Sequence, residues 1–340
     1  MPAQEIAEGR SRSQPLVSIV IPTMNESSFL GTAFESLRAQ TYPQDRLEIL
    51  VVDGGSSDGT VAFAEDAARS DPRIRVFGGP GVNCPAALNI GIAEARGSIV
   101  WYLGGHGQAD RSYVETAVED LAGDPHIGCV GGVIVPAGEG RTARANMIAR
   151  FSVFGVGRSV YTTSPTRHDI DTVQWGAYRK DALEQAGLFD PDLQFGEDEE
   201  LNFRIRQNGY RILYDPLLSI TYFARPTFKG LFRQYRNYGR ARVRVIRKHP
   251  SFFRLKHIIP SALIVALGVA ALLPLFLPSL WVLSLLVIGG YALLIAVASV
   301  ALAYRERFPY PHYVAISLLA LHFGYGLGMI RGLVDLVRGR

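Results

Sequence analysis

The chain has 340 residues, of which 48% are hydrophobic and 19% are charged. This composition excludes wholesale disorder, and the length suits one large domain with an additional segment. The net charge is +4, and many basic residues gather between 225 and 256, directly before a very apolar tail. A basic run in that place favours lipid headgroups over nucleic acid as a partner. We therefore expect contact with membrane lipids and no nucleic-acid binding.

The start of the chain and its cysteines bear on the cellular compartment. Residues 1–15 form a polar tail without the apolar core of a signal peptide, so the globular part is expected to stay in the cytoplasm. Cys84 and Cys129 have neither CxxC nor metal-ligand spacing. We interpret both as packing residues in a reducing compartment.

Short apolar runs alternate with helical stretches after this tail. Strands are expected at 17–22, 47–53, 73–77 and 98–103, and helices at 27–40, 58–68 and 85–96. This alternation predicts an α/β domain with a mainly parallel sheet covered on both faces. In such sheets ligands bind beyond the carboxyl ends of the strands, so the polar residues at those ends are the candidates for a site.

Polar segments follow the first two expected strands. They read Pro22-Thr23-Met24-Asn25-Glu26 and Asp53-Gly54-Gly55-Ser56-Ser57-Asp58-Gly59-Thr60. Asp58 either belongs to the site or caps the next helix. Asp53 ends a buried strand, where an unpaired carboxylate is costly, so a ligand N–H such as the imide of uracil is its expected partner. The sequence lacks GxGxxG after the first strand and lacks GxxxxGK[ST], which argues against a dinucleotide-binding Rossmann domain and a P-loop NTPase.

These segments resemble the opening of the family-2 inverting glycosyltransferases, which have the GT-A fold. The resemblance implies that both segments contact the donor nucleotide, and Asn89, in Pro85-Ala86-Ala87-Leu88-Asn89-Ile90-Gly91, matches the asparagine of the family's third block. The implied donor-binding residues are Pro22, Thr23, Asn25, Glu26, Asp53, Ser56, Asp58, Asn89, Gly104 and Gly105.

The fourth block departs from the family pattern. The family usually carries Asp-x-Asp or Asp-Ala-His here, and its acidic residue holds the Mn²⁺ or Mg²⁺ that bridges the donor diphosphate. In this chain His106 fits the third position, but Gly104 stands where the aspartate is expected. Divalent ions prefer oxygen ligands, so three alternatives stay open. His106 and another group hold Mn²⁺, arginines replace the metal, or the enzyme is impaired; His106 is otherwise a loop residue without a role.

Four consecutive acidic residues, Glu197 to Glu200, open a later helix. The helix dipole favours one or two acids there, but repulsion among four raises at least one pKa, which suits a general base. The resemblance implies that a Glu-Asp pair at this place provides the base. We predict that Asp198 takes the proton from the acceptor hydroxyl, with Glu197 as the next candidate, and that Glu199 and Glu200 are structural.

Three further features concern the acceptor. Trp175 either stacks on a sugar or packs in the core. Arg240 and Arg242, with Gln234 nearby, are predicted to bind a diphosphate or lipid phosphate; ordinary juxtamembrane basic residues are the alternative. The Gln-x-x-Arg-Trp motif of processive synthases fails at Asn237 and Tyr238, which favours the addition of one sugar.

The end of the chain has two long segments without Asp, Glu, Lys or Arg, at 258–304 and 308–330. A spanning helix needs roughly 20 apolar residues, so we predict three transmembrane helices at 258–276, 279–304 and 309–330. Pro274 and Pro278 are predicted to form the first turn. The positive-inside rule places Lys256 and the Arg305-Arg307 loop in the cytoplasm and the C-terminal arginines outside.

Together these features resemble succinoglycan-type exopolysaccharide glycosyltransferases over residues 17–250. We predict a catalytic domain at 16–250, on the cytoplasmic side of a bacterial inner membrane, and a multi-pass membrane segment at 251–340. The expected reaction is inverting transfer from a nucleotide sugar, expected to be a UDP-sugar, to a lipid-linked or growing glycan. A transferase-like binding or scaffold protein, suggested by Gly104, and a processive synthase are the alternatives. A transporter is disfavoured, because it would need charged or broken intramembrane helices, which this sequence lacks.

Overall fold

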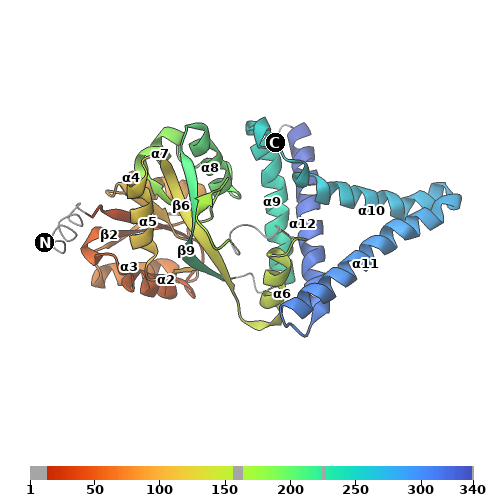
Figure 1. Ribbon diagram of the computed structural model, residues 1–340, viewed down its shortest axis with the longest axis horizontal. Coiled ribbons are helices and arrows are strands. Elements are labelled where there is room, and N and C mark those ends of the chain that lie inside the picture. Colours follow the sequence, from red (N-terminus) through yellow and green to blue (C-terminus); the bar gives the residue numbers. More distant parts are fainter. Residues whose placement is uncertain (1–13, 156–163, 224–226, 339–340) are drawn as a thin grey trace. The chain divides into compact units, whose positions relative to one another are not determined.

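The computed structural model describes residues 14–155, 164–223 and 227–338, and the chain divides into two compact units (Figure 1). Unit 1 comprises Met1–Val135 and Ser164–Tyr222, and unit 2 comprises Pro136–Thr163 and Phe223–Arg340. Most of the predicted polar tail at 1–15 lies outside the described residues. The domain boundary that the sequence suggested at residue 250 falls inside unit 2.

Unit 1 is built on one mixed sheet. Its strands are β1 (Val17–Thr23), β2 (Leu47–Asp53), β3 (Ile74–Gly78), β4 (Ile99–Tyr102), β5 (Gly107–Ala109), β6 (Ile127–Ala137), β7 (His168–Asp169), β8 (Ala177–Arg179) and β9 (Arg211–Phe223). Their order is β3-β2-β1-β4-β8-β6-β9-β5, with β7 beside β9. The first four strands pair in parallel, whereas β4–β8, β6–β8, β5–β9 and β7–β9 are antiparallel. The prediction of a mainly parallel sheet is therefore right for the first half only.

The helices of unit 1 follow the strands in the expected alternation. They are α2 (Leu30–Arg38), α3 (Thr60–Ser70), α4 (Cys84–Glu94), α5 (Tyr113–Gly123), α7 (Lys180–Ala186) and α8 (Glu197–Gln207). All residues of β2 are buried, as expected for a parallel strand covered on both faces. Thr23 and Asp53 are paired in register at the ends of β1 and β2, so the polar segments that follow them lie at one sheet edge. Cys129 is buried and Cys84 is partly buried, and both are free.

Unit 2 is helical. It contains α6 (Gly140–Arg150), α9 (Phe228–Lys248), α10 (Ile259–Phe276), α11 (Trp281–Arg305) and α12 (Pro311–Val337). The last three are long and apolar enough to cross a membrane, as predicted from the charge-free segments, and they indicate a membrane protein. Pro278 begins the turn between α10 and α11. Pro274 lies inside α10, so its predicted place in that turn is wrong.

Candidate active site

Asp53 ends β2, and its carboxylate holds the loop that follows. The side chain is 3% exposed and accepts hydrogen bonds from the backbone N–H groups of Gly55 and Ser56 at 2.7 Å each, from Ser56 Oγ at 2.5 Å and from Thr23 Oγ1 at 3.1 Å. Burial acts to raise the pKa of Asp53, but these hydrogen bonds lower it below its usual value. The expectation that this carboxylate has no partner within the protein and needs a ligand N–H is therefore wrong.

The loops after β1 and β2 are joined by further hydrogen bonds. Asn25, which has a φ of +57°, donates its backbone N–H to Ser56 Oγ at 2.8 Å and accepts from the Ser57 N–H at 2.9 Å. Asp58 accepts from the Thr60 hydroxyl at 2.5 Å and from the Thr60 N–H at 3.1 Å. The Thr60 hydroxyl is the main reason why the pKa of Asp58 lies well below its usual value. Asp58 thus supports the start of α3, and the two loops form one connected surface.

The Gly104-Gly105-His106 turn lies against the first loop. His106 Nδ1 is 3.0 Å from Glu26 Oε1, and a Cβ at Gly105 would lie 3.1 Å from Cγ of Glu26. The turn after β4 and the loop after β1 are therefore in direct contact, as expected for neighbouring parallel strands. This contact places the glycines and His106 beside Glu26, one of the predicted donor-binding residues.

Trp175 explains the glycine at position 104. Its side chain is 4% exposed, and its ring centroid lies 5.3 Å from that of His106. A Cβ at Gly104 would overlap the indole of Trp175, so the space that a side chain at 104 would enter is already filled. Trp175 is thus a core residue, and its predicted stacking on a sugar is not supported.

Glu197 and Asp198 begin α8. Oε1 of Glu197 is 3.5 Å from the hydroxyl of Tyr102 and 4.0 Å from Sγ of Cys84. Burial and the charge of Asp198 raise the pKa of Glu197 above its usual value of 4.5. Because two crowded carboxyl groups resist double ionisation, this pair is suited to hold one neutral and one ionised group. Asp198 Oδ1 accepts a hydrogen bond from the Glu199 N–H at 2.8 Å.

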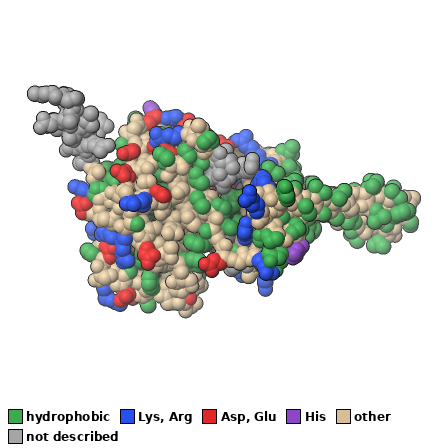
Figure 2. All heavy atoms as spheres, turned by 60° about the horizontal axis from the view of Figure 1, so that its bottom comes forward, with side chains coloured by type: hydrophobic (Ala, Val, Ile, Leu, Met, Phe, Trp, Pro, Cys, Tyr) green, Lys and Arg blue, Asp and Glu red, His purple; other side chains and the backbone are tan. Residues whose placement is uncertain are grey.

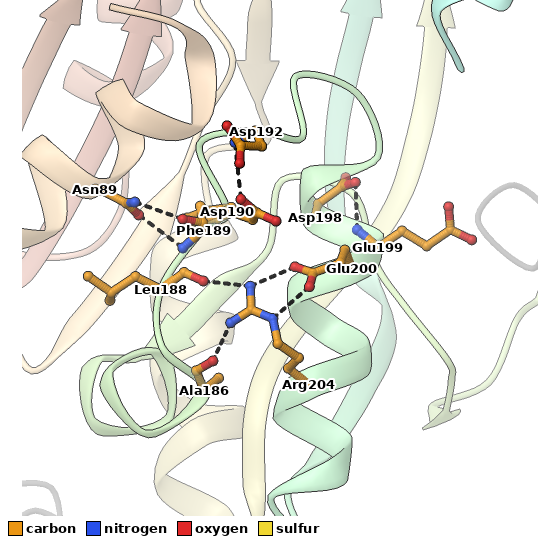
Figure 3. Close-up of polar contacts among 10 residues, drawn as sticks. All are labelled: Asn89, Ala186, Leu188, Phe189, Asp190, Asp192, Asp198, Glu199, Glu200 and Arg204. Carbon is orange, nitrogen blue, oxygen red and sulfur yellow. Dashed lines mark hydrogen bonds and ion pairs between the residues drawn. The ribbon is translucent and has the colours of Figure 1, made fainter. Parts of the chain in front are cut away.

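Figure 3 shows how the segment before α8 is held. Asn89 donates to the Phe189 carbonyl at 2.8 Å and accepts from the Phe189 N–H at 2.9 Å. Arg204 binds both carboxylate oxygens of Glu200, at 2.8 and 2.6 Å, and the Leu188 carbonyl at 2.6 Å. Glu200 is completely buried, so its predicted structural role is confirmed. Asn89 uses both ends of its amide on the Phe189 backbone, which makes it a positioning residue and does not support its predicted donor contact.

The sequence missed two residues near the acidic pair. Tyr102 ends β4 and Cys84 begins α4, and the two side chains lie 3.5 Å apart next to Glu197. Tyr102 directly precedes the Leu103-Gly104-Gly105-His106 block, and that place at a strand end could have identified it. Cys84 carried no such signal, because its approach to α8 depends on the tertiary fold.

Three predicted acceptor residues, Gln234, Arg240 and Arg242, lie on α9 in unit 2. Nε of Arg240 is 2.7 Å from Oδ2 of the buried Asp335, whereas the guanidinium of Arg242 lies over the ring of Phe252 at 5.0 Å. Residues two apart on a helix point to different sides, so Arg240 and Arg242 do not form one clamp. A cavity of about 370 Å³ is instead lined by Arg236, Asn237, Arg240, Gly328 and Arg331.

The residues available to a divalent metal are few. Within residues 14–155, 164–223 and 227–338, no three His, Cys, Asp or Glu side chains form a metal-binding group. Glu26 and His106 nevertheless place a carboxylate oxygen and an imidazole nitrogen 3.0 Å apart. An ion that also takes oxygen ligands from a bound diphosphate and from water needs only one or two protein ligands. This pair therefore fits a metal that arrives with the donor.

Comparison with known proteins adds the family to this geometry. The model of glycosyl transferase family 2 matches residues 18–187, which is half of the chain. The chain belongs to glycosyl transferase family 2. The predicted family is thus confirmed, and the chain is a glycosyltransferase that uses a nucleotide-sugar donor.

Relatives of this family-2 chain match it over almost its whole length. The succinoglycan biosynthesis protein ExoA of Rhizobium meliloti is 29% identical over 94% of this chain and 96% of its own length. A dolichyl N-acetyl-α-D-glucosaminyl phosphate 3-β-D-2,3-diacetamido-2,3-dideoxy-β-D-glucuronosyltransferase of Methanococcus voltae is 24% identical over 93% of this chain and 98% of its own. The mannosyltransferase PcManGT from Pyrobaculum calidifontis, solved with GDP-mannose and Mn²⁺, has a TM-score of 0.60 at 21% identity, covering 95% of this chain and 88% of its own. This last likeness shows the GT-A fold.

Proposed function

We propose that the chain adds one sugar, with inversion, from a UDP-sugar to a lipid-linked glycan in exopolysaccharide or cell-envelope polysaccharide synthesis. The proposed location is a bacterial inner membrane, with unit 1 in the cytoplasm. The observation that carries the proposal is the joined loop surface at the ends of β1 and β2, in the same unit as the Glu197-Asp198 pair. The names of the relatives, which include exopolysaccharide and dolichyl-linked glycan enzymes, support this choice of acceptor.

The donor site is proposed at the loops after β1 and β2. A carboxylate has about four acceptor positions, and four donors within the protein already use those of Asp53. Asp53 therefore acts by fixing residues 54–58, whose backbone groups contact the uracil. Glu26 and His106 lie beside the donor diphosphate in this proposal, where a bound Mn²⁺ would neutralise charge on the leaving group.

The reaction needs a base beside the anomeric carbon. With the pKa of Glu197 raised, Glu197 keeps its proton at neutral pH and Asp198 carries the negative charge. Asp198 then accepts the proton of the acceptor hydroxyl while the hydroxyl oxygen attacks the anomeric carbon and the nucleoside diphosphate leaves with the electrons of the broken bond. Tyr102, 3.5 Å from Glu197 Oε1, holds the neutral carboxyl in place beside Asp198.

A screen of nucleotide sugars tests the donor assignment. We expect UDP and UDP-sugars, in the presence of Mn²⁺, to raise the melting temperature of the purified full-length protein in detergent. A ligand at 100 times its dissociation constant adds about 2.7 kcal/mol to the free energy of unfolding. His106→Ala should remove the part of this shift that depends on Mn²⁺. A shift by GDP-sugars alone would exclude UDP-sugars as donors, and no shift by any nucleotide would favour the scaffold alternative.

The acceptor phosphate is proposed to bind the cavity of Arg236, Arg240 and Arg331. Asp335 is 3% exposed and holds both Arg240 Nε, at 2.7 Å, and Arg331 Nε, at 3.1 Å. One carboxylate therefore orients two guanidinium groups, and Arg236 adds a further positive charge. A phosphate is the anion that such converging guanidinium groups bind well.

Arg240→Gln is expected to raise the KM for a lipid-linked acceptor about 10- to 100-fold, since one charge-assisted hydrogen bond contributes roughly 1.5–3 kcal/mol. UDP affinity and kcat should change little. Arg242→Gln is the matched control, because Arg242 lies over Phe252 and does not line the cavity. If Arg240→Gln fails to fold, Arg236→Gln provides the same measurement. Equal KM values for the wild type and both cavity variants would exclude this site.

A further inference from the structure

The helix α12 is packed lengthwise against α9, which runs beside it in the same direction (Figure 1). Near the start of α9, the ring centroids of Phe228 and Tyr313 are 5.7 Å apart. Farther along, a Cβ at Gly328 would overlap the carbonyl oxygen of Arg236, and near the end Arg240 is ion-paired with Asp335. Backbones this close require small residues, and three glycines of α12 meet α9: Gly324, Gly328 and Gly332.

The partner helix α9 is strongly basic along its whole length. Its exposed basic residues are Lys229, Arg233, Arg236, Arg240, Arg244, Arg247 and Lys248. Its opposite, buried side carries small and apolar residues: Leu231, Tyr235, Gly239, Ala241, Val243 and Val245. Such a helix has the composition of one that lies at a membrane surface, with its basic residues at the level of the headgroups.

A second basic helix, α6, covers the first half of α12. Asn146 of α6 is 1% exposed and its Oδ1 accepts a hydrogen bond from Ser317 at 2.8 Å. Two arginines of α6 contact the segment that leads into α12. Arg141 lies over the ring of Tyr310 at 4.3 Å, and Arg144 donates to the Glu306 carbonyl at 2.9 Å.

These contacts are incompatible with a membrane crossing by α12. If α12 spanned the bilayer, α9 and part of α6 would enter the hydrocarbon with it. Charged side chains inside the bilayer are costly and need partners, and Asp335 is the one acidic residue within α9 and α12. That single carboxylate already has two arginines, Arg240 and Arg331. Four other exposed basic residues of α9 would therefore find no further carboxylate on either helix: Lys229, Arg233, Arg236 and Arg247.

The other two apolar helices have little contact with basic elements. α10 meets α12 near its own start, where Ser261 Oγ donates to the Gly326 carbonyl at 3.3 Å. From its middle onward α11 returns to α12, and there the Tyr291 hydroxyl is 3.0 Å from His322 Nδ1. Between these points α10 and α11 diverge from α12 and meet at a turn (Figure 1), forming the apolar arm seen in Figure 2. Leu275 and Phe276 near this turn are 74% and 79% exposed, so the arm is a hairpin that a bilayer can cover.

We propose that only the α10–α11 hairpin enters the membrane, and that α12 lies with α9 on the cytoplasmic surface of the anionic bilayer. The chain then ends on the same side as Lys256 and the Arg305-Arg307 loop. Arg331 and Arg338 come to the side that the positive-inside rule favours, whereas three crossings would place them outside. The proposal changes the predicted number of crossings from three to two. It is independent of the proposed sugar and acceptor.

Cysteine labelling of the full-length protein in cells tests this topology. Val337, at the end of α12, and Tyr304, at the end of α11, are each 88% exposed. Val337→Cys and Tyr304→Cys would be made separately in a chain whose Cys84 and Cys129 are replaced by alanine. The outer membrane of the cells would be permeabilised while the inner membrane stays intact. We expect a membrane-impermeant maleimide to label neither variant in these cells, and to label both variants after the inner membrane is also permeabilised.

Three crossings give a different pattern, since Val337→Cys would then react in intact cells while Tyr304→Cys would not. That result would overturn the proposal. Ser279→Cys, in the exposed turn between α10 and α11, is the positive control because the turn lies on the opposite side. If a background variant fails to fold, the wild-type chain with a fluorescent protein after Arg340 gives the same decision. Fluorescence, which requires a cytoplasmic C-terminus, supports two crossings, and its absence at normal expression contradicts them.

Discussion

Replacing Asp198 by asparagine is expected to lower turnover by about 10²- to 10⁴-fold, which is the usual effect of removing positioned proton transfer. Asparagine keeps the shape of the side chain, and its carbonyl can still accept the hydrogen bond from the Glu199 N–H. It cannot take a proton. Binding of UDP should therefore change little, because the loops after β1 and β2 are untouched. Initial rates at saturating donor, with calorimetry for UDP, separate these two effects.

Glu197→Gln is the matched variant at the adjacent position. Burial and the charge of Asp198 raise the pKa of Glu197, so at neutral pH the wild-type side chain is neutral, as glutamine is. We expect Glu197→Gln to retain most of the wild-type turnover at neutral pH. At higher pH the wild-type Glu197 ionises and adds a charge beside Asp198, which glutamine cannot do, so the two pH profiles should separate on the alkaline side.

The opposite pattern would identify Glu197 as the base. In that case Glu197→Gln would lose the larger part of turnover, and Asp198→Asn would stay near the wild type. Glu199→Gln serves as a control for the charge of the helix N-terminus, whose interaction with one acid is typically 0.3–1 kcal/mol. A loss for Glu199→Gln as large as that for Asp198→Asn would mean that the charge of the segment matters and the proton acceptor does not.

The parallel half of the sheet could be predicted from the sequence, and the antiparallel half could not. β1 and β2 are mostly apolar segments rich in Val, Ile and Leu, interrupted only near their starts by Ser18 and Glu48, and such segments signal buried parallel strands. β5, β7 and β8 have only two or three residues. Such strands are too short to show a period, and they exist because neighbouring strands supply their hydrogen bonds.

The residues of the site could be found from the sequence, but not what each one contacts. The rule that ligands bind at strand ends pointed to Asp53, Gly104 and His106, which lie at or just after the ends of β2 and β4; their contact with a donor stays a prediction. Asp53 was assigned to a ligand because the sequence does not show its four hydrogen-bond donors, which reach the carboxylate only when the chain folds. The rule left Trp175 undecided, since only the tertiary structure brings the indole against Gly104.

The predicted boundary at residue 250 differs from the division into two units for a related reason. The arginines of α9 mark it as a helix near a membrane, but the sequence does not show that its buried side packs along α12, which lies more than 60 residues later in the chain. Similarly, α6 is separated in sequence from every other helix of unit 2. Hydropathy describes each helix alone, whereas the number of membrane crossings depends on which helices pack together.

Asp53→Ala is expected to weaken UDP binding about 10- to 100-fold, since leaving the partners of a buried charged group unsatisfied costs roughly 1–3 kcal/mol. The substitution removes the acceptor for Gly55, Ser56 and Thr23, so the loop after β2 loses its fixed shape. The β2 residues before it stay buried among their neighbours, and the fold should survive. Calorimetry with UDP gives the affinity, and circular dichroism checks the fold.

Asp53→Asn decides whether the carboxylate fixes the loop or contacts the base directly. Asparagine keeps one oxygen for the N–H groups of Gly55 and Ser56, and its amide can donate to the hydroxyls of Ser56 and Thr23, which also accept hydrogen bonds. If Asp53 acts through the loop, Asp53→Asn should bind UDP several-fold more tightly than Asp53→Ala. If the uracil imide donates to the carboxylate, asparagine and alanine should lose similar affinity. Ser57→Ala is the control within the same loop, because the Ser57 side chain is exposed and its hydroxyl makes one long contact, 3.4 Å, with Asn25. Wild-type affinity in Asp53→Ala would remove Asp53 from the donor site altogether.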